Sequence, residues 1–218
     1  MGEKIMKKLI ASAIIGIVII GGTAQAAGPT VYKDQITALN TLKVADESRI
    51  GYVRTKFKHW TGTGNGCDSR KAVIISEAVK KPVVEKGCVI KGGEWLSIYD
   101  NVTVTEAGKL DVDHFVPLAE SWDSGASAWT PGKREMYAND QTDPRHLIAV
   151  TGGSNRSKSD RDPAEWLPTN KAYTCEYLTT WVSVKVRWSL TVDKVEKSAL
   201  ESNLKSCKKQ KISVVPVK

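Results

Sequence analysis

The chain of 218 residues is long enough for one domain, and its 41% hydrophobic content is sufficient for a sizeable core. Its formal net charge of +8 suits a polyanionic partner but does not identify one. No internal repeat or low-complexity segment occurs, which excludes repeat architectures.

Residues 1–26 have the pattern of a secretory signal peptide and are set apart from the fold. Three lysines precede an apolar run over residues 9–20, and residues 24–26 form a small-x-small cleavage signal. The run is shorter than the roughly 20 residues that a membrane span needs, although an uncleaved anchor is the alternative. We therefore predict a secreted or periplasmic protein that begins near Ala27, without stable membrane insertion and with a net charge of +6.

Residues 27–109 are predicted to form an N-terminal part with helices followed by a β-meander. Apolar residues recur there at helical spacing, and short β-prone segments later alternate with Gly-Gly and Asp-Asn turns. The predicted helices cover residues 30–49, 52–60 and 67–79. The predicted strands cover residues 87–91, 95–99 and 102–105.

Four cysteines occur without Cys-x-x-Cys spacing in a chain predicted to be exported. Disulfides are therefore expected rather than a zinc site. Three pairings are formally possible. We expect Cys67–Cys88 and Cys175–Cys207, because each pair joins neighbouring segments and the two pairs flank the central region.

Two short runs within residues 110–168 contain the residues best suited to chemistry. The first, residues 111–117, alternates like a β-strand that a proline stops. The second, residues 154–160, follows a strand-like segment and a Gly-Gly turn, with Ser154 as the predicted N-cap of a helix. Strand, turn and helix would bring an acid, an imidazole and an amide together. Between the runs lies an insertion in which Pro131 is predicted to open a helix.

The pattern Asp113-His114-x-x-Pro117, His146-Leu147 and Asn155-x-x-Lys158 resembles the HNH, or ββα-metal, endonuclease motif. The surrounding segments LDVDHFVPLAESWDSGASAW, REMYAND, HLIAV and NRSKSDRDPAEWLP are similar to the secreted bacterial HNH endonuclease family related to the C-terminal domain of the GmrSD restriction enzymes. The resemblance implies an α+β fold with a ββα-metal core over residues 110–168. Residues 169–218 are expected to form a C-terminal helical part.

The resemblance also implies roles for individual residues. His114 would be the general base that activates water, and Asp113 and Asn155 would hold a divalent metal, with Mg²⁺ expected. The central position of the motif, often Asn in HNH sites, is His146 here. Its role is open between a metal ligand or catalytic residue and a loop-holding residue. Direct ligation by His146 would favour Mn²⁺, Ni²⁺ or Zn²⁺.

Three basic residues near Asn155 are candidates for nucleic-acid binding, namely Arg156, Lys158 and Arg161. Lys158 and Arg161 are also candidates for a catalytic role, the stabilisation of phosphate charge in the transition state. A solvated helix face is the alternative for Arg156 and Lys158.

The combined prediction is a secreted, monomeric, metal-dependent endonuclease that hydrolyses DNA, with RNA as a second candidate substrate. Little sequence specificity is expected, because no base-reading module is recognisable. One alternative is a cell-wall glycosidase that uses carboxylates such as Glu106, Asp113 and Glu120. The other is a non-catalytic polyanion-binding protein.

Overall fold

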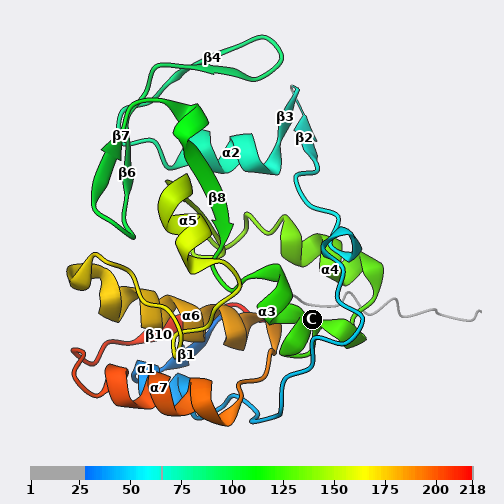
Figure 1. Cartoon of the computed structure of the whole chain (residues 1–218), viewed down its shortest axis with the longest axis vertical. Helices are drawn as coiled ribbons and strands as arrows, with labels where there is room; N and C mark the ends of the chain where they lie inside the picture. The colour runs from blue at the N-terminus through cyan, green and yellow to red at the C-terminus, as the bar shows by residue number, and fades with distance from the viewer. Residues whose placement is uncertain (1–27, 65, 218) are drawn as a thin grey trace, which may run out of the picture.

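The computed structural model describes residues 28–64 and 66–217, so the predicted signal peptide lies outside the described residues. Within them, helices and short strands are mixed, as predicted for an α+β chain. Most small sheets and one helix occupy one half of the molecule, and the longer helices occupy the other (Figure 1). The strand β8 and the helix α5 lie between the two halves (Figure 1).

The strands form separate two-stranded antiparallel sheets that share no strand. The pairs are β1 (Thr30–Tyr32) with β10 (Ile212–Val214), β2 (Gly62–Gly64) with β3 (Cys67–Asp68), β4 (Val83–Glu85) with β5 (Val89–Lys91), β6 (Trp95–Ser97) with β7 (Val102–Val104), and β8 (Leu110–His114) with β9 (Leu147–Thr151).

The predicted β-meander is wrong in its pairing. β5 pairs with β4 rather than with β6, and no strand was predicted over β4. The physical reason is the turn between them, where Gly87 and Cys88 have positive φ angles of 78° and 61°. Two consecutive residues with positive φ make the tight turn that closes a hairpin.

The helices are α1 (Gln35–Leu39), α2 (Ser69–Ser76), α3 (Leu118–Asp123), α4 (Pro131–Ala138), α5 (Gly152–Lys158), α6 (Thr174–Trp188) and α7 (Lys194–Leu204). Single 3₁₀ turns are η1 (Arg54–Lys56), η2 (Ala107–Lys109), η3 (Ala126–Ala128) and η4 (Lys171–Tyr173). The predicted helix over residues 30–49 shrinks to α1, and the helix predicted over residues 52–60 is only the turn η1.

Strand β8 connects two separate hydrophobic cores. Its first residues, Leu110 and Val112, pack with α2, β6 and β9 in the smaller core. The residues just after it, Phe115 and Val116, belong to the larger core, which α1, α4, α6 and α7 build. The end of β8, at His114, therefore lies where the two cores meet, and burial on both sides fixes its position.

The outer edge of β9 is covered by side chains instead of a further strand. Ala149 N donates a hydrogen bond to Glu77 Oε2 at 2.7 Å, and Thr151 N donates to Ser97 Oγ at 3.0 Å. These contacts satisfy backbone donors that would otherwise be buried without partners. They attach the β8–β9 pair to α2 and to the β6–β7 hairpin.

Buried ion pairs attach the insertion between β8 and β9 to helix α6. Lys185 Nζ lies 2.7 Å from Glu120 Oε1 and 2.6 Å from Glu196 Oε2, with all three side chains buried. Arg187 Nε lies 2.8 Å from Asp140 Oδ2. The insertion is thus held by the C-terminal helical part.

Both predicted disulfides, Cys67–Cys88 and Cys175–Cys207, are present. The first ties β3 to the β4–β5 turn, and the second ties α6 to the segment after α7. In the part of the chain that the structure describes, no helix combines the length and apolar character needed to cross a bilayer.

Candidate active site

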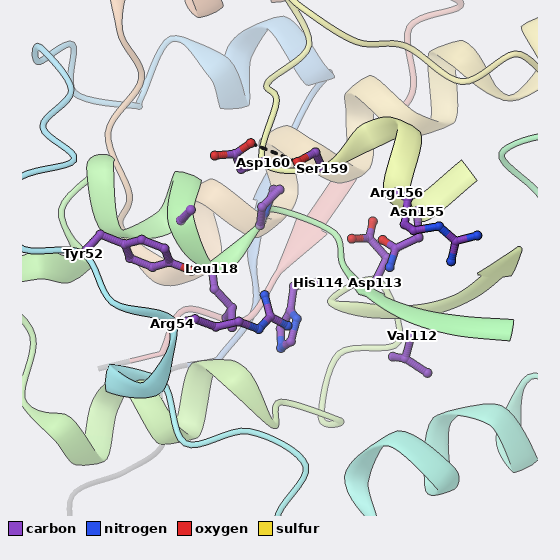
Figure 2. Close-up of a pocket in the computed structure, with 12 residues that line it drawn as sticks. Tyr52, Arg54, Val112, Asp113, His114, Leu118, Asn155, Arg156, Ser159 and Asp160 are labelled. Atoms are coloured by element: carbon purple, nitrogen blue, oxygen red, sulfur yellow. Dashed lines mark hydrogen bonds between the residues drawn. The ribbon is translucent and has the colours of Figure 1, made fainter. Parts of the chain in front are cut away.

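A cavity of about 450 Å³ opens where β8 ends and α5 packs against it (Figure 2). We call it the cleft. Its lining comprises Tyr52, Arg54, Val112, Asp113, His114, Pro117, Leu118, Ala119, Asn155, Arg156, Ser159 and Asp160. The structure therefore gathers four of the residues predicted for the site, Asp113, His114, Asn155 and Arg156.

The end of β8 explains how neighbouring residues reach one cavity. In a regular strand, Asp113 and His114 would point to opposite faces. β8 ends at His114, and the chain turns at Pro117 into α3, so both side chains line the cleft. The predicted end of this strand is confirmed.

His114 is held as a neutral imidazole. Its Nε2 lies 2.9 Å from Ala138 O, and a carbonyl can only accept, so Nε2 carries the proton and Nδ1 keeps a free lone pair. The ring of Trp60 packs on the imidazole, with the two centroids 5.1 Å apart. Burial lowers the pKa of His114 well below its usual value, and the nearby charge of Arg54 adds to the effect.

Asp113 is a buried carboxylate with fixed partners. Lys158 Nζ lies 3.0 Å from its Oδ1 and 2.8 Å from its Oδ2, and the Tyr99 hydroxyl donates to Oδ2 at 2.7 Å. Burial raises the pKa of Asp113, and the positive charge of Lys158 opposes that rise. Lys158 also donates to His114 O at 3.2 Å, so it attaches α5 to the end of β8.

Asn155 enters the cleft from the middle of α5. Its Nδ2 donates to Asp111 Oδ2 at 3.2 Å, which fixes the orientation of the amide because a carboxylate can only accept. The amide oxygen therefore faces away from Asp111. The N-cap of α5 is Thr151 rather than the predicted Ser154. The hydroxyls of Thr151 and Ser154 both donate to Asp100 Oδ2, at 2.5 and 2.8 Å respectively.

His146 lies behind the cleft and is not part of its lining. Its side chain is fully buried, its Nε2 lies 2.7 Å from Tyr137 O, and its ring packs edge-on against the Tyr137 ring. Burial lowers the pKa of His146 to about 4. The structure therefore places His146 at the end of α4 and outside the cleft lining, with its ring centroid 6.5 Å from that of His114.

The basic residues that were predicted to bind nucleic acid lie in three different environments. Arg156 is exposed and lines the cleft. Lys158 is fully buried on Asp113, so its ammonium faces the interior. Arg161 lies in a separate cavity of about 510 Å³ that is rich in carboxylates, and its Nε donates to Lys158 O at 3.3 Å.

Two cleft residues, Tyr52 and Arg54, were absent from the predicted site. They come from the segment around η1, far upstream of the motif in the sequence. No local pattern in that segment indicates chemistry. Only the packing of the folded chain brings it to His114, as Figure 2 shows.

The carboxylates of the glycosidase alternative do not gather in the cleft. Glu120 is buried against Lys185, and Glu106 is exposed beside Lys109 at 2.6 Å. Glu120 has donor oxygens within 4.8 Å of those of Glu47 and Asp123. That group lies outside the cleft lining.

Comparisons with known proteins identify the family of the chain. The family model for the C-terminal domain of GmrSD restriction endonucleases matches residues 77–201, which include β8, β9 and α5. An uncharacterized secreted protein of Arthroderma benhamiae is 41% identical over 157 residues, which cover 72% of this chain and 76% of that protein. No solved structure matches the chain. The chain therefore belongs to the family of GmrSD restriction endonuclease C-terminal domains.

Proposed function

We propose that the protein is an exported, metal-dependent endonuclease that hydrolyses phosphodiester bonds in DNA, with RNA as a second candidate substrate. The observation that carries the proposal is the cleft itself, in which a neutral imidazole with a free Nδ1 adjoins the oxygen donors of Asp113 and Asn155. Membership of a restriction endonuclease domain family supports a nuclease-related function. The order of β8, β9 and α5 supports a ββα-metal assignment for this part of the chain.

The donor atoms fit a hard divalent cation. A carboxylate offers about four lone-pair positions, and Lys158 and Tyr99 use three of those on Asp113, which leaves one on Oδ1. The oxygen of Asn155 accepts no hydrogen bond from the described residues. Asp113 and Asn155 would therefore hold the ion, and oxygen ligands favour Mg²⁺. Such an ion would polarise a phosphate oxygen and make bound water more acidic.

The residues around the cleft have separate tasks in hydrolysis. Nδ1 of His114 takes a proton from the attacking water, while the hydrogen bond from Nε2 to Ala138 O keeps the ring in the required tautomer. Lys158 keeps Asp113 in place and favours its ionised form. Asp111 orients the amide of Asn155. We assign His146 to holding α4, through the contact of its Nε2 with Tyr137 O.

The proposed nuclease is exported and binds nucleic acid with little sequence specificity. The two disulfides suit an oxidising compartment, and the relative described above is named a secreted protein. We expect a monomer that acts in the periplasm or outside the cell. Basic charge without a base-reading module favours sequence-tolerant binding.

The test is plasmid cleavage with Mg²⁺ or Mn²⁺, with and without EDTA, for the wild type and for His114→Ala. The variant should bind metal and DNA but cleave roughly 10²–10⁴ times more slowly, because it lacks the general base. Asp113→Ala and Asn155→Ala should weaken metal binding in calorimetry, with activity partly restored by excess metal. His59→Ala is the matched control, since His59 is the neighbouring histidine and lies outside the cleft lining.

Two results would contradict the proposal. One is a folded wild-type protein that cleaves neither plasmid nor RNA with either metal. The other is a His114→Ala protein with a native circular dichroism spectrum that cuts plasmid at nearly the wild-type rate. A non-catalytic polyanion-binding protein would give the first result while still retaining DNA.

A further inference from the structure

The cleft has fewer free positive charges than the sequence suggested. Lys158 is paired with Asp113, and Arg161 lies in the separate carboxylate-rich cavity. Arg156 Nη1 lies 3.7 Å from Asp111 Oδ2, so part of its charge is balanced within the protein. Apart from the proposed divalent ion, a positive charge that contacts a phosphodiester beside His114 would therefore come from another part of the chain.

Arg54 meets that requirement. It is exposed and lines the cleft together with Asp113, His114 and Asn155. In Figure 2 its guanidinium lies beside the His114 imidazole, while Asn155 and Arg156 lie on the other side of that ring. The influence of its charge on the pKa of His114 agrees with this closeness.

The charge of Arg54 is not balanced by a carboxylate. Arg156 and Lys158 each form an ion pair, and Arg161 lies in the carboxylate-rich cavity. Over residues 28–64 and 66–217, Arg54 forms no ion pair. An unpaired guanidinium at the edge of a cavity keeps its full attraction for an anion.

The backbone that carries Arg54 is firmly anchored. Phe57 N donates to Arg54 O at 3.1 Å, and the Phe57 ring is fully buried between the rings of Trp122 and Tyr137. Lys56, in the same turn, donates to Gly51 O at 2.7 Å and lies over the Trp122 ring. The turn η1 is thus fixed, and Arg54 is the side chain that it directs into the cleft.

We propose that Arg54 binds the non-bridging oxygens of the phosphate that is hydrolysed. A guanidinium presents a planar fork of donors that can bind two phosphate oxygens at once. Its place beside His114 puts it next to the phosphate that the activated water attacks, where negative charge increases in the transition state. This role rests on the proposed nuclease function. It makes Arg54 a catalytic residue supplied from outside the HNH-like motif.

The experiment compares Arg54→Gln and Arg54→Lys with the matched control Lys58→Gln, which removes one positive charge from an exposed side chain just after the turn and outside the cleft lining. The substrates are plasmid DNA and thymidine 5′-(4-nitrophenyl) phosphate, which has one phosphodiester and no flanking phosphate. Arg54→Gln should lower kcat by about 10²–10³-fold on both substrates, as loss of a donor to a developing charge does. Arg54→Lys should recover only part of the rate, because an ammonium lacks the fork. Lys58→Gln should keep kcat within about twofold of the wild-type value, because it loses only a surface ion pair.

A second readout separates contact with phosphate from a structural role. Free guanidinium ion, at a concentration that does not denature the protein, should restore part of the activity of Arg54→Ala and leave the activity of Lys58→Gln unchanged. Circular dichroism and thermal melting of all variants should match the wild type, because the side chains of Arg54 and Lys58 are exposed.

The possible outcomes are distinguishable. If the wild type hydrolyses both substrates and Arg54→Gln does so at a similar kcat, the role of Arg54 is overturned while the proposed function stands. A loss confined to KM on plasmid, with the small substrate unaffected, also overturns it, because Arg54 would then bind a flanking phosphate. If the wild type hydrolyses neither substrate, the proposed function fails first and this role fails with it.

Discussion

Glu77 is expected to make the stability of the protein depend on pH near neutrality. Burial raises the pKa of its carboxyl from 4.5 to about 7, although the hydrogen bond from Ala149 N acts in the opposite direction. A raised pKa in the folded state means that folding favours the protonated form. The resulting stabilisation is complete below about pH 4.5 and is lost as the pH rises through about 7.

The magnitude follows from the size of the shift. A change from 4.5 to about 7 corresponds to about 3 kcal/mol of unfolding free energy, at about 1.4 kcal/mol for each pH unit. Glu77→Gln keeps an oxygen that can accept from Ala149 N but cannot ionise. The unfolding free energy of the variant should exceed that of the wild type by only about 1 kcal/mol at pH 5 and by about 3 kcal/mol at pH 8.

The assay is urea unfolding of both proteins at several pH values between 5 and 8. A carbon-13 NMR titration of the Glu77 carboxyl provides an independent measurement, with a midpoint expected near 7. Parallel stability curves for the two proteins would refute the reasoning. They would mean that Glu77 ionises as easily in the folded chain as in the unfolded one.

Three further predictions concern stability and binding. Lys185→Met leaves the two buried carboxylates of Glu120 and Glu196 without their cation and should lower the unfolding free energy in urea by about 3 to 5 kcal/mol. A loss below about 1 kcal/mol would mean that these carboxylates do not depend on Lys185. Replacing Cys175 and Cys207 by serine opens a loop with a sequence separation of 32 residues and should lower the unfolding free energy by about 4 kcal/mol in the same assay. An unchanged unfolding free energy would mean that this disulfide does not stabilise the fold. The DNA affinity of His114→Ala should fall linearly with salt on logarithmic axes, with a slope of about 0.9 for each phosphate contact, and a salt-independent affinity would exclude phosphate as the main attraction.

The end of β8 and the start of α5 could be predicted because proline and glycine mark them in the sequence. Pro117 limits the strand, and the glycines at 152 and 153 permit the tight entry into α5. Asp113, His114 and Asn155 accordingly line one cavity. The cap of α5 was misplaced by three residues, because the Thr151 hydroxyl, at the end of β9, accepts from Ser154 N.

The burial of Lys158 could not be predicted in the same way. Helix α5 has seven residues, GGSNRSK, and none of them is a large apolar residue. Without an apolar stripe, no hydrophobic periodicity shows which face of the helix turns inward. The packing of α5 on β8 decides it, and this packing puts the Lys158 ammonium on Asp113.

Contacts between segments that are far apart in the sequence could not be predicted from residue patterns either. Arg54 reaches the cleft because Phe57 packs between aromatic rings from other elements. No residue spacing in the sequence predicts that packing. The pairing of β4 with β5 depended on backbone angles at Gly87 and Cys88. A positive φ at cysteine is not a preference that its residue type reveals.

The pairing of β1 with β10 has a consequence for the order of folding. Among the described residues, strand Thr30–Tyr32 pairs with Ile212–Val214 and with no other strand, and α1 packs on α6 and α7, which lie close to β10 in the sequence. β1 and α1 are therefore synthesised well before the elements that bury them. Contacts of such long sequence separation slow folding, since a large loop must close before they form. In a chain threaded through a translocation channel from its N-terminus, β1 and α1 would stay unburied until α6, α7 and β10 had emerged.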